Sequence, residues 1–107
     1  MHETEKFASL RSGLMEFVIL SLIAREKVYV ADILKELSST EFKTQEGTLY
    51  PLLSRLRREA LVEYEWQESP TGPPRKYYRL TTKGHEQLKN MQDYWNILIN
   101  TIKSFKK

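Results

Sequence analysis

The sequence predicts a mainly α-helical chain with a small β hairpin, a winged helix-turn-helix followed by a long C-terminal dimerisation helix. Three observations predict it. Three apolar segments come first, an alternating segment broken by a Pro- and Gly-rich stretch follows, and a heptad-spaced segment ends the chain. Two short helices before a hairpin have the order of a helix-turn-helix and its wing. We expect one compact unit, with the DNA-binding domain at 1–80 and the dimerisation helix at 81–107.

Composition limits the chemistry that the chain can perform. Its 107 residues are 40% hydrophobic and 29% charged, which suits one small globular domain. It has no cysteine and two histidines, so disulfides, thiolate chemistry and a metal site are not expected, and no cofactor is predicted. Glycine-rich phosphate loops and nucleophile motifs are absent, so we do not expect an enzyme. The net charge of +3 is compatible with a polyanionic partner.

The first helix is predicted within 10–24, where apolar residues point in nearly every direction. A helix of this kind must be covered all round, and a second subunit is a natural cover for Leu14, Phe17 and Val18. The apolar stretch is shorter than the roughly 20 residues that a membrane span needs. The N-terminus lacks the pattern of a signal peptide, so we expect a cytoplasmic protein with no membrane partner.

A second helix is predicted at 30–37 from its apolar stripe, and a third opens near Thr44, a candidate N-cap. Leu49, Leu52, Leu53 and Leu56 form the buried face of the third helix. Pro51 is expected to distort the helix near its start.

The opposite face of the third helix carries groups that can contact DNA in a major groove. Gly47, Pro51, Ser54, Arg55 and Arg58 are predicted to face outward, and Thr48, Tyr50 and Arg57 lie on the flanks. The alternative is an ordinary solvated helix face. The DNA-binding candidates on this helix are Gln45, Thr48, Tyr50, Ser54, Arg55 and Arg58.

Period-two alternation predicts a strand over 61–67, and a second strand follows at 76–80. The stretch 69–74 is expected to be a loop because of its prolines and glycine. The four cations after this loop are Arg75, Lys76, Arg79 and Lys83. A basic hairpin tip suits DNA phosphates or the minor groove, with Arg75 and Lys76 as the site candidates; a solubilising loop is the alternative. Cross-strand pairing with Lys or Arg explains Glu63, Glu65 and Glu68 better than catalysis does.

The last segment predicts a helix of about 24 residues, or about 36 Å, capped by Thr81 or Thr82. Its apolar residues repeat at heptad spacing, which favours contact between subunits of a homodimer. The predicted dimer contacts are Leu14, Phe17, Val18, Leu88, Met91, Trp95, Leu98 and Ile102.

Trp95 stands in the middle of this apolar seam and has two interpretations. It could line a cavity at the dimer axis that binds a planar aromatic molecule, with Met91, Met15 and Phe7 as further effector-binding candidates. It could equally be a packing residue, with the two indoles against each other or against Phe7 and Met15.

Three segments together resemble the PadR family of bacterial transcriptional regulators: LRSGLMEFVIL at 10–20, EGTLYPLL at 46–53 and GPPRKYYRLT at 72–81. They occur in the order and spacing of the family, and the resemblance covers nearly the whole chain from Leu10. Two places differ: 29–32 is YVAD where the family usually has YGYE, and Ala60 stands where glycine is frequent after the recognition helix. An alanine tolerates a left-handed conformation poorly, which bears on the turn into the wing.

This resemblance implies a dimeric repressor that binds a palindromic operator through its third helix and its wing. It also places the chain in the small subfamily, some of whose members bind planar aromatic drugs between paired tryptophans at the position of Trp95. The alternative function is a winged-helix protein-interaction module without DNA binding. Such a module should lose its wing cations and outward arginines, whereas this chain keeps Arg55, Arg58, Arg75 and Lys76.

Overall fold

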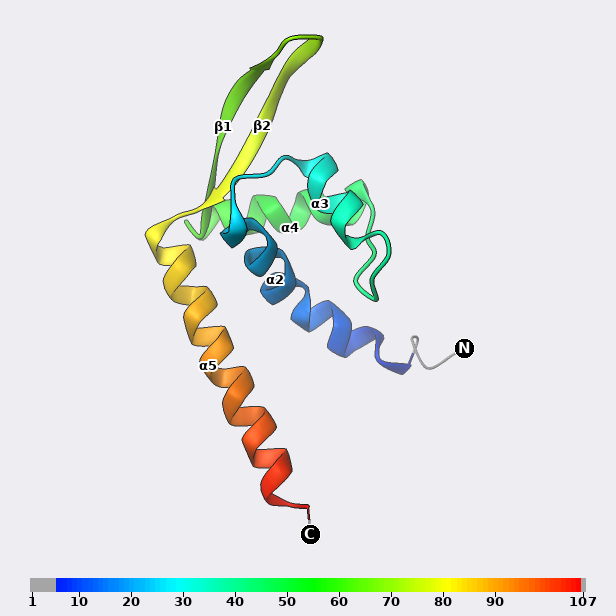
Figure 1. Cartoon of the computed structure of the whole chain (residues 1–107), viewed down its shortest axis with the longest axis vertical. Coiled ribbons are helices and arrows are strands. Elements are labelled where there is room, and N and C mark those ends of the chain that lie inside the picture. Colours follow the sequence, from blue (N-terminus) through cyan, green and yellow to red (C-terminus); the bar gives the residue numbers. More distant parts are fainter. Residues whose placement is uncertain (1–5, 107) are drawn as a thin grey trace.

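A computed structural model describes residues 6–106 and has the predicted order of elements. The elements are α2 (Ala8–Arg25), α3 (Val30–Leu37), α4 (Glu46–Arg58), β1 (Val62–Ser69), β2 (Gly72–Leu80) and α5 (Thr82–Ser104). Helices α2, α3 and α4 cluster at the centre, the hairpin projects to one side and α5 extends to the opposite side (Figure 1). The molecule measures 59 × 36 × 21 Å. The winged helix-turn-helix prediction is confirmed.

The core lies where the three central helices meet the base of the hairpin. Side chains from every element are buried in it, including Ile19, Leu20, Ile33, Leu53 and Val62. The C-terminal half of α2 is therefore covered within one subunit, because Ile19, Leu20, Leu22 and Ile23 are all buried. Its N-terminal half is covered only in part. The all-round apolar pattern thus has an intramolecular explanation for half of this helix.

The helix starts follow from local hydrogen bonds. The backbone N–H of Tyr29 donates to Asp32 Oδ2 at 3.3 Å, which fixes the first turn of α3. Helix α4 begins after Gln45, whose backbone is extended and whose side chain makes no capping bond. The prediction of Thr44 as the N-cap is wrong, because the helix starts one residue later. Thr81 caps α5 as predicted, and its Oγ1 accepts the N–H of Gly84 at 2.9 Å.

The turn from α4 into the wing passes through Ala60, which has φ 63°. The N–H of Leu61 donates to the carbonyl of Leu56 and the N–H of Ala60 donates to that of Arg57, both at 2.9 Å. This is the Schellman pattern, with Leu61 and Leu56 both buried beside it. The alanine therefore keeps the left-handed turn that glycine usually makes, at the steric cost of its Cβ.

The hairpin is longer than the alternation predicts. Strand β1 pairs antiparallel with β2 from Val62↔Leu80 to Ser69↔Gly72, so only Pro70 and Thr71 remain between the strands. The prediction that 69–74 is a loop is wrong for Ser69 and for 72–74. Prolines at 73 and 74 are tolerated because the register is irregular between Gln67 and Ser69, and because each strand of a two-stranded ribbon has a free edge.

Among residues 6–106, no helix is long and apolar enough to cross a membrane.

Candidate nucleic-acid interface

Helix α4 presents its predicted polar face to solvent. Leu49, Leu53 and Leu56 are buried below it, and Leu52 is half-buried. The opposite side carries exposed Gly47, Pro51, Ser54 and Arg58, and the DNA-binding candidates Gln45, Thr48 and Tyr50 are exposed as well. Glycine at 47 leaves open space, since an added Cβ would meet no atom within 4 Å. A groove of DNA could approach this face closely.

Arg55 was predicted to face outward with these residues, but its side chain points toward α2. Its Nη2 lies 3.0 Å from Glu16 Oε1 on α2, and its Nη1 lies 3.1 Å from Oε2 of Glu59, the residue that follows the last residue of α4. The hydrogen bond that Arg55 donates to Glu16, followed by the one it donates to Glu59, raises the pKa of Arg55 above its ordinary value. The guanidinium thus lies on the flank of α4 that faces α2.

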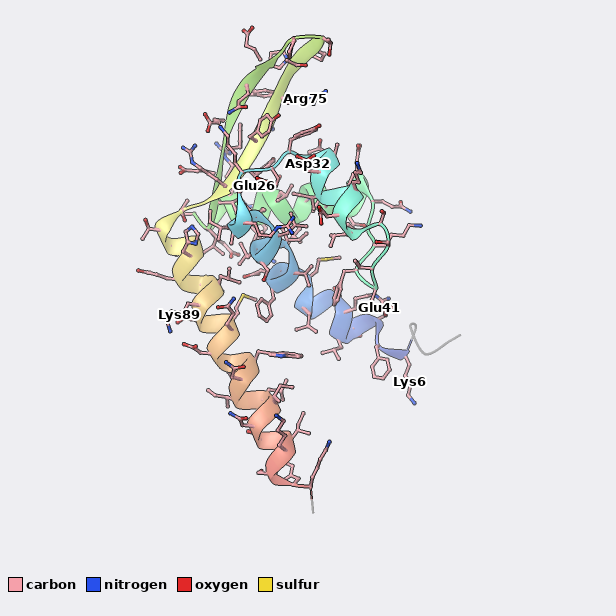
Figure 2. The ribbon with its side chains drawn as sticks, in the orientation of Figure 1. Lys6, Glu26, Asp32, Glu41, Arg75 and Lys89 are labelled. Atoms are coloured by element: carbon pink, nitrogen blue, oxygen red, sulfur yellow. The ribbon has the colours of Figure 1, made fainter. Side chains whose placement is uncertain are left out.

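A hollow of about 460 Å³ lies between the start of α3, the start of α4 and the wing. We call it the wing hollow. Tyr50 of α4, Trp66 of β1, and Arg75 and Lys76 of β2 line it together with Tyr29. Figure 2 shows Arg75 on the hairpin near the start of α3, where Asp32 lies. The fold therefore brings together three candidates from two distant segments.

Aromatic rings hold the two wing cations in place. The Arg75 guanidinium lies 4.7 Å from the ring centre of Tyr29, and the Lys76 ammonium lies 4.5 Å from that of Tyr64 and 5.4 Å from that of Trp66. Cation–π contacts of this kind orient a charge without neutralising it. The role of these rings as partners of the wing cations is not among the predictions from the sequence. Trp66 pairs with Lys76 in the register of the hairpin, so an accurate register could have revealed that ring.

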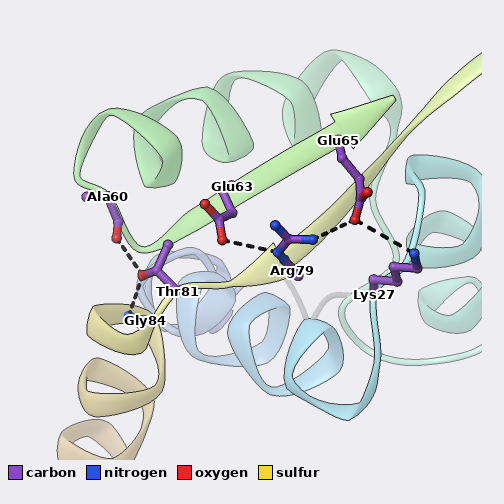
Figure 3. Close-up of polar contacts among 7 residues, drawn as sticks. All are labelled: Lys27, Ala60, Glu63, Glu65, Arg79, Thr81 and Gly84. Carbon is purple, nitrogen blue, oxygen red and sulfur yellow. Dashed lines mark hydrogen bonds and ion pairs between the residues drawn. The ribbon is translucent and has the colours of Figure 1, made fainter. Parts of the chain in front are cut away.

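The other two predicted wing cations have structural partners. Arg79 lies between Glu63 and Glu65 on the neighbouring strand, and Lys27 lies 3.7 Å from Glu65 (Figure 3). The hydrogen bond to Glu63 is the main cause that raises the pKa of Arg79. This confirms cross-strand pairing for Glu63 and Glu65, while Glu68 is exposed beside the turn. Lys83 Nζ donates to the carbonyl of Glu59 at 2.9 Å.

A second hollow, of about 250 Å³, lies between α2 and α5, and we call it the Trp95 hollow. Trp95 and Met91 line it with Leu14 and Phe17, and the rings of Phe17 and Trp95 meet edge to face with centres 6.5 Å apart. The structure does not bring the other two effector candidates here. Met15 lines a different hollow, between α2 and α4, and Phe7 precedes α2 with 51% of its surface exposed.

Three of the eight predicted dimer contacts form an exposed apolar strip on α5. Trp95, Leu98 and Ile102 are 38%, 39% and 46% exposed on the half of α5 that projects beyond the core. On the facing helix, the side chains of Leu14, Phe17 and Val18 are half-buried. Leu88 differs, since it is buried in the core of its own subunit, where it cannot present a surface to a partner.

Comparisons with known proteins agree with this fold. The transcriptional regulator PadR-like family model matches residues 19–90. A PadR-like transcription factor from Bacteroides fragilis is 40% identical, covering 95% of this chain and 99% of its own, with a TM-score of 0.82. A PadR-like regulator from Bacillus cereus is 36% identical, covering 90% and 94%, with a TM-score of 0.80. An uncharacterised protein of Lysinibacillus sphaericus is 31% identical over 86 residues, covering 78% of this chain and 79% of its own.

Proposed function

Because the chain belongs to the PadR-like family of transcriptional regulators, we propose that it binds an inverted-repeat operator as a homodimer and represses transcription. The observation that carries this proposal is the wing hollow. It places Tyr50 of α4 beside two cations of the wing, Arg75 and Lys76. A helix that reads base edges and a basic wing that contacts phosphates are the two parts that a winged helix-turn-helix needs.

The N-terminal end of α4 reads the DNA in this proposal. Gln45, Thr48 and Tyr50 are exposed there and carry amide and hydroxyl groups that can contact base edges in the major groove. Ser54 and Arg58 lie further along the exposed side and contact the flanking phosphates. Arg75 and Lys76 fix the register of the protein on the duplex without reading sequence.

The homodimer is proposed to form through the exposed apolar strip of α5. Trp95, Leu98 and Ile102 project beyond the core, where a second copy of α5 and the N-terminal half of α2 can cover them. Two-fold symmetry then places two α4 helices in successive major grooves. The half-sites should lie about 10 bp apart, or a multiple of that distance.

A planar aromatic effector is proposed to bind at the Trp95 hollow, where the dimer brings two copies together. One copy encloses about 250 Å³, lined mainly by apolar side chains. Stacking of a flat ring on an indole adds about 0.5–1.5 kcal/mol beyond its burial. A ligand that fits one angle between the subunits better than another changes operator affinity by that difference.

Selection from a random pool of duplex DNA tests the proposal. We expect enrichment of one inverted repeat, bound by a species of twice the subunit mass in sedimentation. A pool that stays random while the protein is folded would contradict operator recognition and favour the protein-interaction module. A folded monomer that binds a single half-site would contradict the dimer alone.

A further inference from the structure

Glu16 of α2 contacts both α4 and α5. Its side chain is 17% exposed, and each of its oxygens accepts from a different element. Oε1 accepts a hydrogen bond from Arg55 Nη2 of α4 at 3.0 Å, and Oε2 accepts one from Gln87 Nε2 of α5 at 3.3 Å. One carboxylate thus joins the DNA-reading helix to the helix that carries the exposed apolar strip.

The contact with Arg55 has a restricted geometry. The same guanidinium also donates a hydrogen bond to Glu59, the residue that follows the last residue of α4. A planar group with two carboxylate partners has little freedom to rotate, because its N–H directions are fixed. Glu16 and Glu59 therefore hold the Arg55 side chain on the flank of α4 that faces α2.

The contact with Gln87 leads to the Trp95 hollow. Gln87 is one of the residues that line this hollow, beside Met91 and Trp95 one and two turns further along α5. Movement of α5 relative to α2, whether from a ligand in the hollow or from rearrangement of the two subunits, displaces the Gln87 amide. A hydrogen bond weakens steeply with such displacement, so Glu16 responds to the position of α5.

We propose that Glu16 is a positioning residue for the DNA-reading helix and that, through Gln87, it makes the placement of α4 depend on α5 and on occupancy of the Trp95 hollow. This inference rests on the proposed function for its DNA and ligand consequences. Because binding free energies are linked, a ligand that breaks the Gln87 contact weakens operator binding, and operator DNA weakens that ligand by the same factor.

The test uses three variants of the 107-residue chain. Gln87→Met removes the donor and keeps the approximate volume of the side chain beside the hollow. Glu16→Gln removes the charge that holds Arg55. Glu59→Gln is the matched control, since it removes the other ion pair of the same guanidinium and leaves the connection to α5 intact.

Two readouts are measured: the Nε–Hε resonance of Arg55 in protein labelled with ¹⁵N-arginine, and affinity for the selected operator at fixed salt. Gln87→Met should shift the Arg55 resonance, although it does not touch Arg55, and leave that of Arg79 unchanged. Gln87→Met and Glu16→Gln should weaken operator binding by about threefold or more, and Glu59→Gln by less than about twofold.

Each arm can overturn the inference by itself. An unchanged Arg55 resonance in Gln87→Met shows that α5 does not act on Arg55, and this result needs neither operator nor ligand. A shifted resonance with unchanged operator affinity overturns the positioning role, as does Glu59→Gln weakening operator binding as much as Glu16→Gln. Failure of the wild-type protein to select an operator contradicts the proposed function instead. The Arg55 resonance of Gln87→Met still shows whether α5 acts on Arg55 through Glu16.

A planar cationic dye tests whether a ligand in the Trp95 hollow acts on Arg55. Binding is followed by quenching of Trp95, with Trp66 as the internal reference. In the wild-type protein the dye should shift the Arg55 resonance, and in Gln87→Met it should bind without shifting it. An equal shift in both proteins overturns the route through Gln87. Absence of quenching in the wild-type protein contradicts the proposed effector. The Arg55 resonances of Gln87→Met and the wild-type protein without dye then test the route through Gln87.

Discussion

Replacing Ala60 by glycine should stabilise the protein, because Ala60 keeps an L side chain at φ 63°. A left-handed conformation costs an L residue about 1–2 kcal/mol. Glycine removes this steric cost. Its greater freedom in the unfolded chain lowers the stability again by about 0.4–1 kcal/mol. The net gain is about 0.5–1 kcal/mol, since the alanine methyl is exposed and loses no packing. That gain corresponds to a rise in Tm of roughly 2–8 °C.

Thermal unfolding followed by circular dichroism measures this effect. Ala31→Gly is the matched control, because Ala31 is exposed in the right-handed backbone of α3 and its replacement should cost up to about 1 kcal/mol. The same chemical change is therefore expected to have opposite signs at the two positions. A Tm of Ala60→Gly at or below that of the wild-type protein would refute the account of the turn.

Three further predictions concern packing, assembly and pH. Gly84→Ala should destabilise by about 1–3 kcal/mol in urea unfolding, since its Cβ would overlap the carbonyl oxygen of Leu61; full stability would mean that the start of α5 can move away. Leu98→Glu should convert the proposed dimer to a monomer in sedimentation, because it places a charge in the apolar strip; an unchanged dimer would place the interface elsewhere. Burial raises the pKa of Tyr78 above 10.0, so the free energy of unfolding should fall as pH rises beyond that value. Tyr78→Phe should flatten the fall, and an equal fall in both proteins would contradict this assignment.

Local patterns predicted the elements well where short-range forces decide them. The apolar stripe indicated a helix at 30–37, and the structure has Val30–Leu37. Thr81 and Thr82 are the two cap candidates for the last helix because of their hydroxyls and their place before it, and Thr81 Oγ1 makes that bond. The hairpin strands were shorter in the prediction because prolines 73 and 74 usually end a strand, and a two-stranded ribbon with an irregular register accepts them.

The site was less predictable, because it depends on how elements rotate against one another. Helical spacing placed Arg55 near the outward face, and Glu16 of a distant helix turns it toward α2. Met15 is adjacent in sequence to residues near the Trp95 hollow, yet it faces α4 instead. The rings of Tyr29 and Tyr64 reach the wing cations only through tertiary packing and the hairpin register. A single sequence holds no direct signal for these contacts.

We propose that the wing and α4 together form one DNA-binding surface, and a salt series on the selected operator tests this proposal. The variant is Arg75→Ala with Lys76→Ala, and the control is Lys89→Ala with Lys103→Ala, which removes two exposed charges from α5. Each lost phosphate contact lowers the slope of log affinity against log salt by about 0.9. We expect the wing variant to lower this slope by nearly 2 and to weaken binding, while the α5 variant keeps the wild-type slope. Equal slopes and affinities for the wing variant and the wild-type protein would contradict it.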